Sequence, residues 1–317
     1  MQVIAGTREF QIKEPTVVTI GKFDGRHKGH QKLLQRMLRF REEKGLRTAI
    51  FTFDMAPAGV VSGKKQSLIT TNQERRNNME KTGIDYLIEY PFNQKVAQMP
   101  PEEFVERILA GQMKARAIVA GTDCGFGYHR AGNAALLKKL APVYGYEAVI
   151  IEKEQDEHRD ISSTYIREQL DKGHIVKANA LLGEPYAIHG EVVHGNHIGA
   201  PLLGFPTANL LPPPEKYLPR FGVYASRVLI DGRYYGGVSN IGAKPTVAGE
   251  NPVGVETYIL GLDPEVDLYG KNIEVQLLDF ERPEQKFAGL SELKARIEMD
   301  KQYAAEYFEK HPEWRLG

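Results

Sequence analysis

Short apolar runs alternate with segments of helical periodicity through the first half of the chain. The apolar runs have the length of buried strands, and they fall at residues 17–20, 48–53, 84–88, 117–120 and 148–151. Amphipathic or capped helical patterns lie between them, at residues 30–44, at 71–83, from 100 onward and at 134–144. This β-α-β-α order predicts a parallel, doubly wound α/β sheet with helices on both faces. Ligands of such sheets bind outside the carboxyl ends of the strands.

The pattern changes near residue 183. A helical segment at 175–182 is followed by Gly183-Glu184-Pro185 and then by short strand patterns, at residues 189–193, 223–230, 234–238, 254–260 and 273–279. Asp231-Gly232 is a hairpin-turn signal between two of these strands. Closely spaced short strands predict a small β-barrel, and residues 290–308 predict a long terminal helix. We therefore expect an α/β domain at residues 1–183 and a β-barrel domain at residues 184–317.

Composition limits the classes of partner. The 317 residues include 41 Lys+Arg and 41 Asp+Glu, so the broad electrostatic attraction to nucleic acid or anionic membranes is missing. The single cysteine, Cys124, excludes an intramolecular disulfide and is typical of the reducing cytoplasm. The sequence shows neither a signal-peptide pattern nor an apolar run of membrane-spanning length. We expect a cytoplasmic protein that binds small molecules, and its oligomeric state stays open.

A glycine-rich turn joins the first predicted strand to the first predicted helix. Residues 21–30 read GKFDGRHKGH, with His27 and His30 three positions apart. A strand that ends in such a turn directs free N–H groups and the positive end of the helix dipole toward a ligand, which favours phosphate. Neither the P-loop lysine pattern nor the three-glycine dinucleotide pattern is present. The alternative is an ordinary strand–turn–helix with surface histidines.

Three further segments carry polar side chains in patterns that suit nucleotide chemistry. In residues 161–167, ISSTYIR, hydroxyl groups precede a helical pattern and Arg167 lies one turn inside it; the alternative is a plain helix cap. In residues 204–209, GFPTAN, Thr207 and Asn209 alternate on an extended segment and offer the oxygen ligands that Mg²⁺ prefers. In residues 254–259, alternation places Glu256 on the face opposite to Val255; its alternative is a solvated strand glutamate.

These motifs together carry a family resemblance that spans essentially the whole chain. Residues 21–30 resemble the nucleotidyltransferase signature His-x-Gly-His, and residues 161–167 resemble the second signature of that family. Residues 204–209 resemble the riboflavin kinase signature. In this order they resemble the bacterial bifunctional riboflavin kinase/FMN adenylyltransferase family, also called prokaryotic FAD synthetases. The glycine-rich segment 121–132 is similar to the family's loop at the flavin and adenosine site, with Cys124 in place of a phenylalanine.

The resemblance implies two ATP-dependent reactions. The first domain would transfer AMP from ATP to FMN, giving FAD and pyrophosphate, with His27, His30 and Arg167 on the phosphates. The second would phosphorylate riboflavin to FMN, with Mg²⁺ held by Thr207 and Asn209 and with Glu256 as general base. A further set is implied to bind nucleotide or flavin: Gly21, Phe23, Asp24, Gly25, Gly29, Asp123, Arg130, Ser162, Ser163, Thr164, Gly190, Gly195, Gly204 and Pro206. Within this set Asp24 orients the turn or one imidazole, or else caps the turn locally.

The chain departs from the family pattern at several positions. The cations Lys22 and Arg26 stand where neutral residues are expected, and Met55-Ala56 stands in place of a proline and a histidine. Ala200-Pro201 follows Gly199 where a basic residue is common, in a segment that resembles a flap over the kinase nucleotide. These departures leave two alternatives: an FMN adenylyltransferase whose barrel only binds flavin, and a flavin-sensing protein without turnover. Retention of the histidines and of Thr207, Asn209 and Glu256 favours the bifunctional enzyme.

Overall fold

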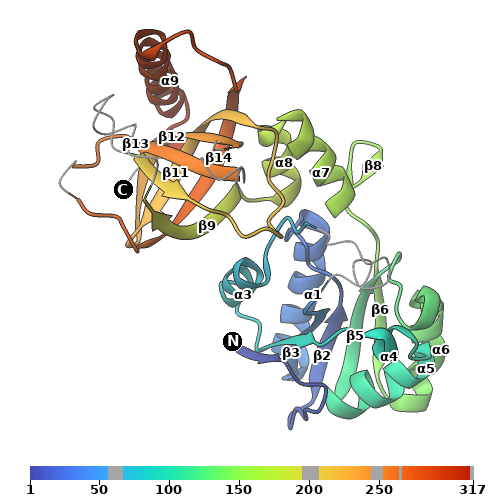
Figure 1. The fold of residues 1–317 in the computed structure, drawn as a ribbon. Coiled ribbons are helices and arrows are strands. Elements are labelled where there is room, and N and C mark those ends of the chain that lie inside the picture. The colour runs from blue at the N-terminus through green and yellow to red at the C-terminus, as the bar shows by residue number, and fades with distance from the viewer. Residues whose placement is uncertain (56–66, 195–206, 244–252, 264–265, 315–317) are drawn as a thin grey trace. The chain divides into compact units, whose positions relative to one another are not determined.

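The structure is a computed structural model that describes residues 1–55, 67–194, 207–243, 253–263 and 266–314 (Figure 1). The chain divides into two compact units, Met1–Ser163 and Thr164–Gly317. Each unit has its own hydrophobic core, and each is described by itself below. Within the described ranges, none of the helices combines the length and the apolar character needed to cross a membrane.

The first unit is built on a parallel sheet. Its strands in the described residues are β1 (Gln2–Ala5), β2 (Thr16–Ile20), β3 (Arg47–Phe53), β4 (Tyr86–Tyr90), β5 (Ala115–Gly121) and β6 (Glu147–Ile151). They pair in the order β1-β4-β3-β2-β5-β6, and every pairing is parallel. The helical segments are α1 (Lys28–Lys44), α3 (Asn72–Glu80), α4 (Gln94–Ala97), α5 (Pro101–Glu103), η1 (Phe104–Gln112), η2 (Tyr128–Arg130) and α6 (Ala134–Tyr144). A hairpin of β7 (Gln155–Asp156) and β8 (Arg159–Asp160) follows.

Side chains that alternate along the central strands bury both faces of this sheet. Val17 of β2 packs in one core with Met37 and Phe40 of α1. Val18 points to the other face and packs in a second core with Phe104 of η1 and Leu137 of α6. Because both faces are covered by helices, the central strands β2, β3, β4 and β5 are buried along most of their length. The predicted doubly wound α/β fold is confirmed.

The structure differs from the sequence-based expectations in three elements of this unit. Strand β1 was not predicted, because it is an edge strand with mostly exposed side chains and only three consecutive apolar residues. Helix α1 begins at Lys28, so His30 lies inside its first turn. The helix that begins after Pro100 continues as a π-helix over Phe104–Gln112, a hydrogen-bond pattern that apolar periodicity does not reveal.

The second unit is a closed barrel with attached helices. Its strands in the described residues are β9 (Tyr186–Val193), β10 (Thr207–Leu210), β11 (Gly222–Ile230), β12 (Arg233–Ala243), β13 (Val253–Ile259) and β14 (Asn272–Pro283). They close in the order β10-β13-β12-β11-β14-β9. The helical segments are α7 (Ser163–Lys172), α8 (Ile175–Leu182), α9 (Leu290–Lys310) and η4 (Pro312–Trp314). The predicted small barrel with a terminal helix is confirmed.

Buried hydroxyl groups link three neighbouring strands of the barrel. The Ser239 Oγ on β12 donates to the Ser226 Oγ on β11 at 2.7 Å, and it lies 2.7 Å from the Thr257 Oγ1 on β13. All three residues are fully buried. The chain of hydroxyls gives each buried polar atom a partner, which offsets the loss of water.

An ionic cluster anchors helix α9 to strand β14. Asp300 of α9 accepts from the guanidinium of Arg282 on β14 at 3.0 and 2.5 Å and from Arg296 Nε at 2.8 Å. Arg296 also donates to Glu281 of β14. Desolvation and the neighbouring Asp300 carboxylate raise the pKa of Glu281 to about 7. Asp300 and Glu281 therefore both pair with Arg296 in this cluster.

Helices α7 and α8 associate with the barrel. Asn179 of α8 donates to the Leu277 carbonyl at 2.8 Å and accepts from the Tyr186 amide at 2.7 Å. The division between the compact units therefore falls at Ser163, whereas the change in sequence texture falls near residue 183. The domain boundary placed at residue 183 stays a prediction.

Candidate active sites

The glycine-rich turn after β2 is shaped by a buried aromatic ring. Phe23 has a positive φ of 49° and is fully buried, and its ring lies 4.6 Å from the ring of His30. A Cβ at Gly21 would lie 3.0 Å from the Phe23 ring, so a side chain at that position would displace it. Phe23 therefore holds the turn and one of the histidines in place. The part in ligand binding that the resemblance implies for Phe23 stays a prediction.

His27 and His30 stack on each other at the start of α1. Their ring centroids are 3.7 Å apart with an interplanar angle of 21°. His27 is the N-cap, and its Nδ1 accepts from the His30 backbone N–H at 3.4 Å. His30 Nδ1 donates to the Gly25 carbonyl at 3.0 Å. A Cβ at Gly29 would lie 3.2 Å from His27 Nδ1, so glycine keeps this position clear.

Both imidazoles are neutral at physiological pH. Burial, followed by the neighbouring His30, lowers the pKa of His27 to about 2. Burial also lowers the pKa of His30 to about 4, although the Gly25 carbonyl and the carboxylates of Asp24 and Asp123 favour the charged form. Because both rings are neutral, they carry no positive charge, and an anion is attracted here by the backbone amide groups and the dipole of α1.

Asp24, Thr70 and Ser163 tie together segments that are far apart in the chain. The Asp24 Oδ1 accepts from the Thr70 amide at 3.2 Å, and the Gly25 amide donates to the Thr70 Oγ1 at 3.0 Å. The Ser163 Oγ donates to the Asp24 carbonyl at 2.7 Å. The structure thus brings Ser163 to the glycine-rich turn. Thr70 was missed from the sequence, where its only signal is its place next to the Thr71–Glu74 capping box.

Glycines allow the loop that follows β5 to pack closely against its neighbours. Gly127 has a φ of +69°, and a Cβ there would lie 2.6 Å from Pro101. Phe126 pairs with Gly132 in an isolated bridge, and a Cβ at Gly132 would overlap the Phe126 ring at 2.4 Å. Arg130 stands at the outer side of the loop, with Nη2 3.5 Å from the Asp123 carbonyl. Cys124 is partly buried, and its thiol pKa is raised to about 11 by desolvation, so it stays protonated.

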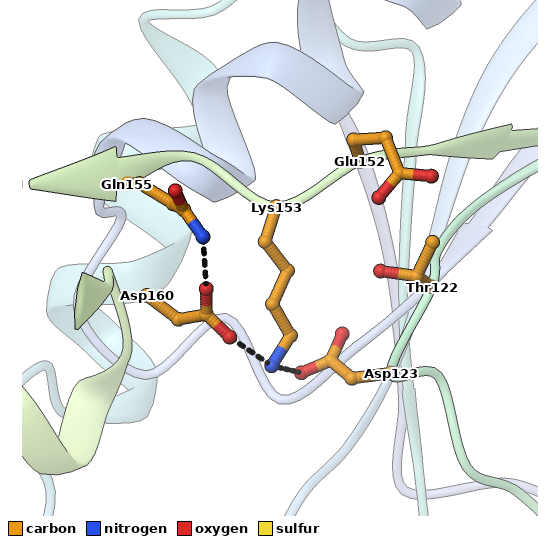
Figure 2. A pocket seen from close by; sticks show the side chains of 6 residues that line it. All are labelled: Thr122, Asp123, Glu152, Lys153, Gln155 and Asp160. Atoms are coloured by element: carbon orange, nitrogen blue, oxygen red, sulfur yellow. Dashed lines mark hydrogen bonds and ion pairs between the residues drawn. The ribbon is translucent and has the colours of Figure 1, made fainter. Parts of the chain in front are cut away.

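A polar cavity of about 360 Å³ opens at the carboxyl ends of β5 and β6 (Figure 2). It is lined by Thr122, Asp123, Glu152, Lys153, Gln155 and Asp160. Lys153 Nζ lies 3.3 Å from Asp123 Oδ2 and 2.9 Å from Asp160 Oδ2, and it lowers the pKa of Asp160. With three carboxylates and only one ammonium group, that of Lys153, the cavity suits a ligand that donates hydrogen bonds from hydroxyl or amine groups better than an anionic ligand. Of these residues, only Asp123 was predicted from the sequence.

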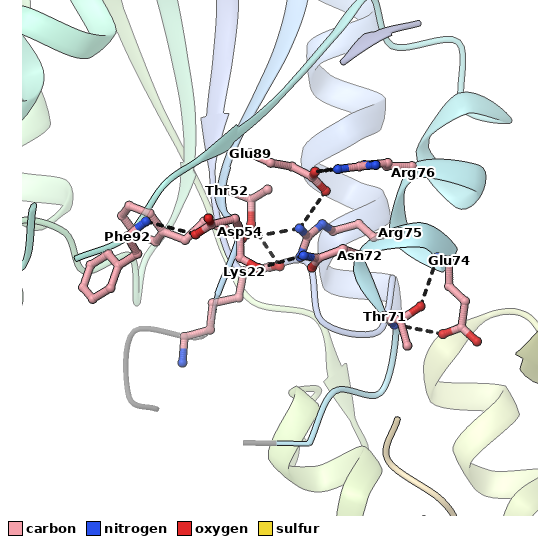
Figure 3. Close-up of polar contacts among 11 residues, drawn as sticks. Lys22, Thr52, Asp54, Thr71, Asn72, Glu74, Arg75, Arg76, Glu89 and Phe92 are labelled. Atoms are coloured by element: carbon pink, nitrogen blue, oxygen red, sulfur yellow. Dashed lines mark hydrogen bonds and ion pairs between the residues drawn. The ribbon is translucent and has the colours of Figure 1, made fainter. Parts of the chain in front are cut away.

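A second polar network lies at the ends of β3 and β4 (Figure 3). Arg75 of α3 donates to Glu89 Oε1 at 2.9 Å, and Arg76 donates to Glu89 Oε2 at 2.9 and 2.5 Å. The Glu89 side chain is only 1% exposed and that of Arg75 only 4%. Asn72 Nδ2 donates to the Asp54 carbonyl at 2.7 Å, which fixes the chain just beyond β3. This network was not predicted.

The positions that depart from the family pattern lie partly in this region. Lys22 is exposed, and its carbonyl accepts from Thr52 Oγ1 at 3.3 Å (Figure 3). Arg26 is partly buried, and its carbonyl accepts from Gln31 at 3.0 Å. Met55 is 52% exposed. Ala56, Gly199 and Ala200-Pro201 lie outside the described residues.

Some of the predicted nucleotide-binding residues lie in the second unit. Thr164 is exposed, and Arg167 of α7 has its guanidinium 5.4 Å from the centre of the Tyr217 ring. Gly190 lies inside β9 opposite Ile273, within the strand predicted at residues 189–193. Gly195, Gly204 and Pro206 lie outside the described residues.

The barrel brings Thr207, Asn209 and Glu256 together on two antiparallel strands. Asn209 of β10 is the register partner of Glu256 of β13. Thr207 Oγ1 donates to Glu256 Oε1 at 2.7 Å, and Asn209 Nδ2 lies 3.5 Å from Thr207 Oγ1. Val255 is fully buried whereas Glu256 keeps part of its surface open, which confirms the predicted alternation of faces. A carboxylate, a hydroxyl and an amide thus converge at one edge of the barrel.

Comparison with known families divides the chain in two. A family model described as FAD synthetase matches residues 9–165. A second model, described as riboflavin kinase, matches residues 182–308. The first match contains the histidines and the polar cavity, and the second contains the three polar residues of the barrel.

Relatives and one solved structure match nearly the full chain. A bifunctional riboflavin kinase/FMN adenylyltransferase of Bacillus subtilis (strain 168) is 36% identical over 304 residues, covering 95% of this chain and 94% of the relative. One of Escherichia coli (strain K12) is 36% identical over 298 residues, covering 93% and 94%. A crystal structure from Streptococcus pneumoniae, described as a macrolide-efflux protein, has a TM-score of 0.85 at 29% identity and covers 96% of this chain and 98% of that one. The chain therefore belongs to the family of bifunctional riboflavin kinase/FMN adenylyltransferases.

Proposed function

We propose that the group around His27 and His30 transfers AMP from ATP to FMN, and that the group around Thr207 and Glu256 phosphorylates riboflavin. As a member of its family, the chain makes FMN from riboflavin and FAD from FMN, with ATP as the second substrate in both reactions. The observation that supports this assignment is the separation of two different polar sites into two compact units. One site lies between the carboxyl end of the internal strand β2 and the N-terminus of α1, and the other lies on barrel strands.

Adenylyl transfer needs alignment and charge stabilisation rather than a covalent intermediate. A phosphate oxygen of FMN attacks the α-phosphorus of ATP, a new P–O bond forms, and the bond to the pyrophosphate oxygen breaks. The N-terminus of α1 stabilises negative charge on the triphosphate, and His27 donates from Nε2 because its Nδ1 accepts from the backbone. The hydrogen bond from Ser163 Oγ to the Asp24 carbonyl holds the glycine-rich turn in position. The roles that the resemblance implies for Thr164 and Arg167 stay predictions.

Phosphorylation of riboflavin needs a base for the terminal hydroxyl of the ribityl chain. Glu256 accepts that proton as the hydroxyl oxygen attacks the γ-phosphorus and ADP leaves. Thr207 Oγ1, which now donates to Glu256, is exchanged for the substrate hydroxyl when riboflavin binds. The release of Glu256 would leave the Thr207 hydroxyl oxygen open to a metal ion.

We further propose Mg²⁺ as the cofactor and the cytoplasm as the site of action. Among the described residues, no group of three or more His, Cys, Asp or Glu side chains is arranged to hold a metal ion. The hydroxyl of Thr207 and the amide of Asn209 suit Mg²⁺, but two neutral ligands bind it only together with substrate phosphates. When bound, Mg²⁺ neutralises charge on the transferring phosphoryl group. The single cysteine, which allows no intramolecular disulfide, fits a reducing compartment.

Product analysis tests the assignment. The purified chain is incubated with ATP and Mg²⁺ and with either riboflavin or FMN, and the flavins are separated by chromatography. We expect FMN and FAD from riboflavin, and FAD from supplied FMN. FAD formed only from supplied FMN would remove the kinase assignment. Absence of product from both flavins would leave a flavin-binding protein without turnover.

A further inference from the structure

The two stacked histidines have opposite hydrogen-bonding roles. A carbonyl oxygen cannot donate, so the 3.0 Å contact with Gly25 requires the proton of His30 to be on Nδ1. A backbone N–H cannot accept, so the 3.4 Å contact with the His30 amide requires His27 Nδ1 to carry a lone pair. A neutral imidazole has one N–H, so its remaining nitrogen is fixed by this choice. Nε2 of His27 is therefore a donor, and Nε2 of His30 is an acceptor.

This difference matters because a triphosphate offers only acceptors. The Nε2–H of His27 can donate to a phosphate oxygen without any change of state. The lone pair on His30 Nε2 would face a lone pair on the phosphate oxygen and repel it. As a whole residue His30 is partly exposed, whereas His27 is only 8% exposed.

We propose that His30 takes up one proton from solvent when the triphosphate binds, so that Nε2–H donates to a phosphate oxygen, whereas His27 stays neutral throughout. The inference rests on the proposed adenylyl-transfer function of this unit. One proton is bound per nucleotide, no covalent bond changes, and the proton returns to solvent when the product leaves. The two histidines of the signature are then not equivalent.

The surroundings of His30 explain why the proton arrives only with the ligand. The positive end of the α1 dipole and the loss of water disfavour the imidazolium in the free protein. The charged groups that act on His30 are Asp24 in its own turn and Asp123 on the β5 loop, and the ring of His27 stacks against it. Lys153 pairs with Asp123 at 3.3 Å and so weakens its support. Two carboxylates alone leave the pKa of His30 at about 4, and the phosphate charge must supply the rest.

The required increase is within reach of a direct phosphate contact. Moving the pKa of His30 from about 4 to above 7 needs an approximately thousandfold stabilisation of the charged ring. Neighbouring opposite charges shift pKa values by about 1–3 units each, and a triphosphate carries several. While the pH lies between the free and the bound pKa values, nucleotide affinity at this site falls about tenfold for each unit that the pH rises.

Nitrogen spectroscopy on the full chain tests the proposal directly. Histidine labelled with ¹⁵N is observed at pH 7.5, with Mg²⁺ present, before and after addition of α,β-methylene ATP, which cannot release pyrophosphate. His27→Gln and His30→Gln variants assign the two rings. We expect the Nε2–H tautomer for His27 in both states, and for His30 a change from the Nδ1–H tautomer to the imidazolium. A His30 ring that stays neutral in the saturated complex would overturn the proposal.

Calorimetry supplies the proton count. Titration of the same analogue in buffers of different ionisation heat gives the protons bound per nucleotide. Because the kinase site also binds nucleotide, the relevant number is the difference between the wild type and His30→Gln, which we expect to be about one proton. Asp123→Asn should reduce this uptake, because it removes a supporting charge. Equal uptake in wild type and His30→Gln would contradict the proposal, whereas absence of any nucleotide effect on either ring would contradict the adenylyl-transfer function itself.

Discussion

Replacement of Glu89 by glutamine should destabilise the first unit strongly. Glu89 is 1% exposed and accepts hydrogen bonds from Arg75, which is 4% exposed, and from Arg76, which is 37% exposed. Glu89→Gln keeps an acceptor but leaves the Arg75 guanidinium buried without a carboxylate. Breaking a buried pair from one side typically costs about 3–5 kcal/mol. Since glutamine retains one hydrogen bond and the Arg76 side chain can turn toward water, we expect a loss in free energy of unfolding at the lower end of this range, about 3 kcal/mol.

Urea unfolding separates this effect by unit. The single tryptophan, Trp314, lies in the second unit, so its fluorescence reports on that unit alone. Far-UV circular dichroism reports on both units. With a urea dependence of about 2 kcal/mol per molar, the first-unit transition should move down by about 1.5 M. The Trp314 transition should stay where it is.

An exposed ion pair of the same unit provides the matched control. Glu103 and Arg107 are joined at 2.6 Å, but their side chains are 37% and 61% exposed. Such an i,i+4 pair contributes about 0.3–0.5 kcal/mol, so Glu103→Gln should shift the transition by about 0.25 M or less. Equal shifts for Glu89→Gln and Glu103→Gln would refute the argument that burial makes the Glu89 pair different.

Three further substitutions probe other contacts. Ser163→Ala removes the donor to the Asp24 carbonyl and should cost about 1 kcal/mol in the first unit while reducing FAD formation; unchanged FAD formation would count against Ser163 as a positioning residue. The pKa of Glu281 is raised in the folded state from 4.5 to about 7, so the stability of the wild type should fall as the pH rises between these two values. In Glu281→Gln the thermal midpoint should decline less between pH 5 and 8, and an equal decline in both proteins would contradict this. Thr257→Val removes one member of the buried hydroxyl chain and should lower the free energy of unfolding of the second unit by about 1 kcal/mol, measured from the urea midpoint of Trp314 fluorescence. An unchanged midpoint would show that the Ser239 hydroxyl does not need Thr257 as a hydrogen-bond partner.

Apolar patterning was enough to predict the fold of each unit. Strands buried on both faces are mostly apolar, so β2, β3 and β5 could be recognised as apolar runs. Edge strand β1 has no such requirement, and its apolar run of three residues was too short to be identified as a strand. The association of α7 and α8 with the barrel depends on contacts such as that of Asn179 with β14, which neighbouring sequence does not encode.

The candidate sites were visible only in part. The histidines, Thr207, Asn209 and Glu256 stand in short motifs, so their chemistry could be recognised locally. The contact of Ser163 with Asp24 spans 139 positions and follows from the sheet topology rather than from spacing. Glu89 was passed over because a charged residue at a strand end is normally exposed. Its burial depends on two arginines from another element, a pairing that a single sequence does not reveal.

The central claim is that the two reactions use separate residues, and one pair of variants tests it. FMN formation from riboflavin and FAD formation from FMN are measured for Glu256→Gln and for His27→Asn, which keeps a residue that caps helices well. Glu256→Gln should reduce FMN formation by about 10²–10⁴-fold and leave FAD formation intact. His27→Asn should reduce FAD formation by about 10²–10³-fold and leave FMN formation intact. Loss of both activities by the same factor in either variant would contradict the account.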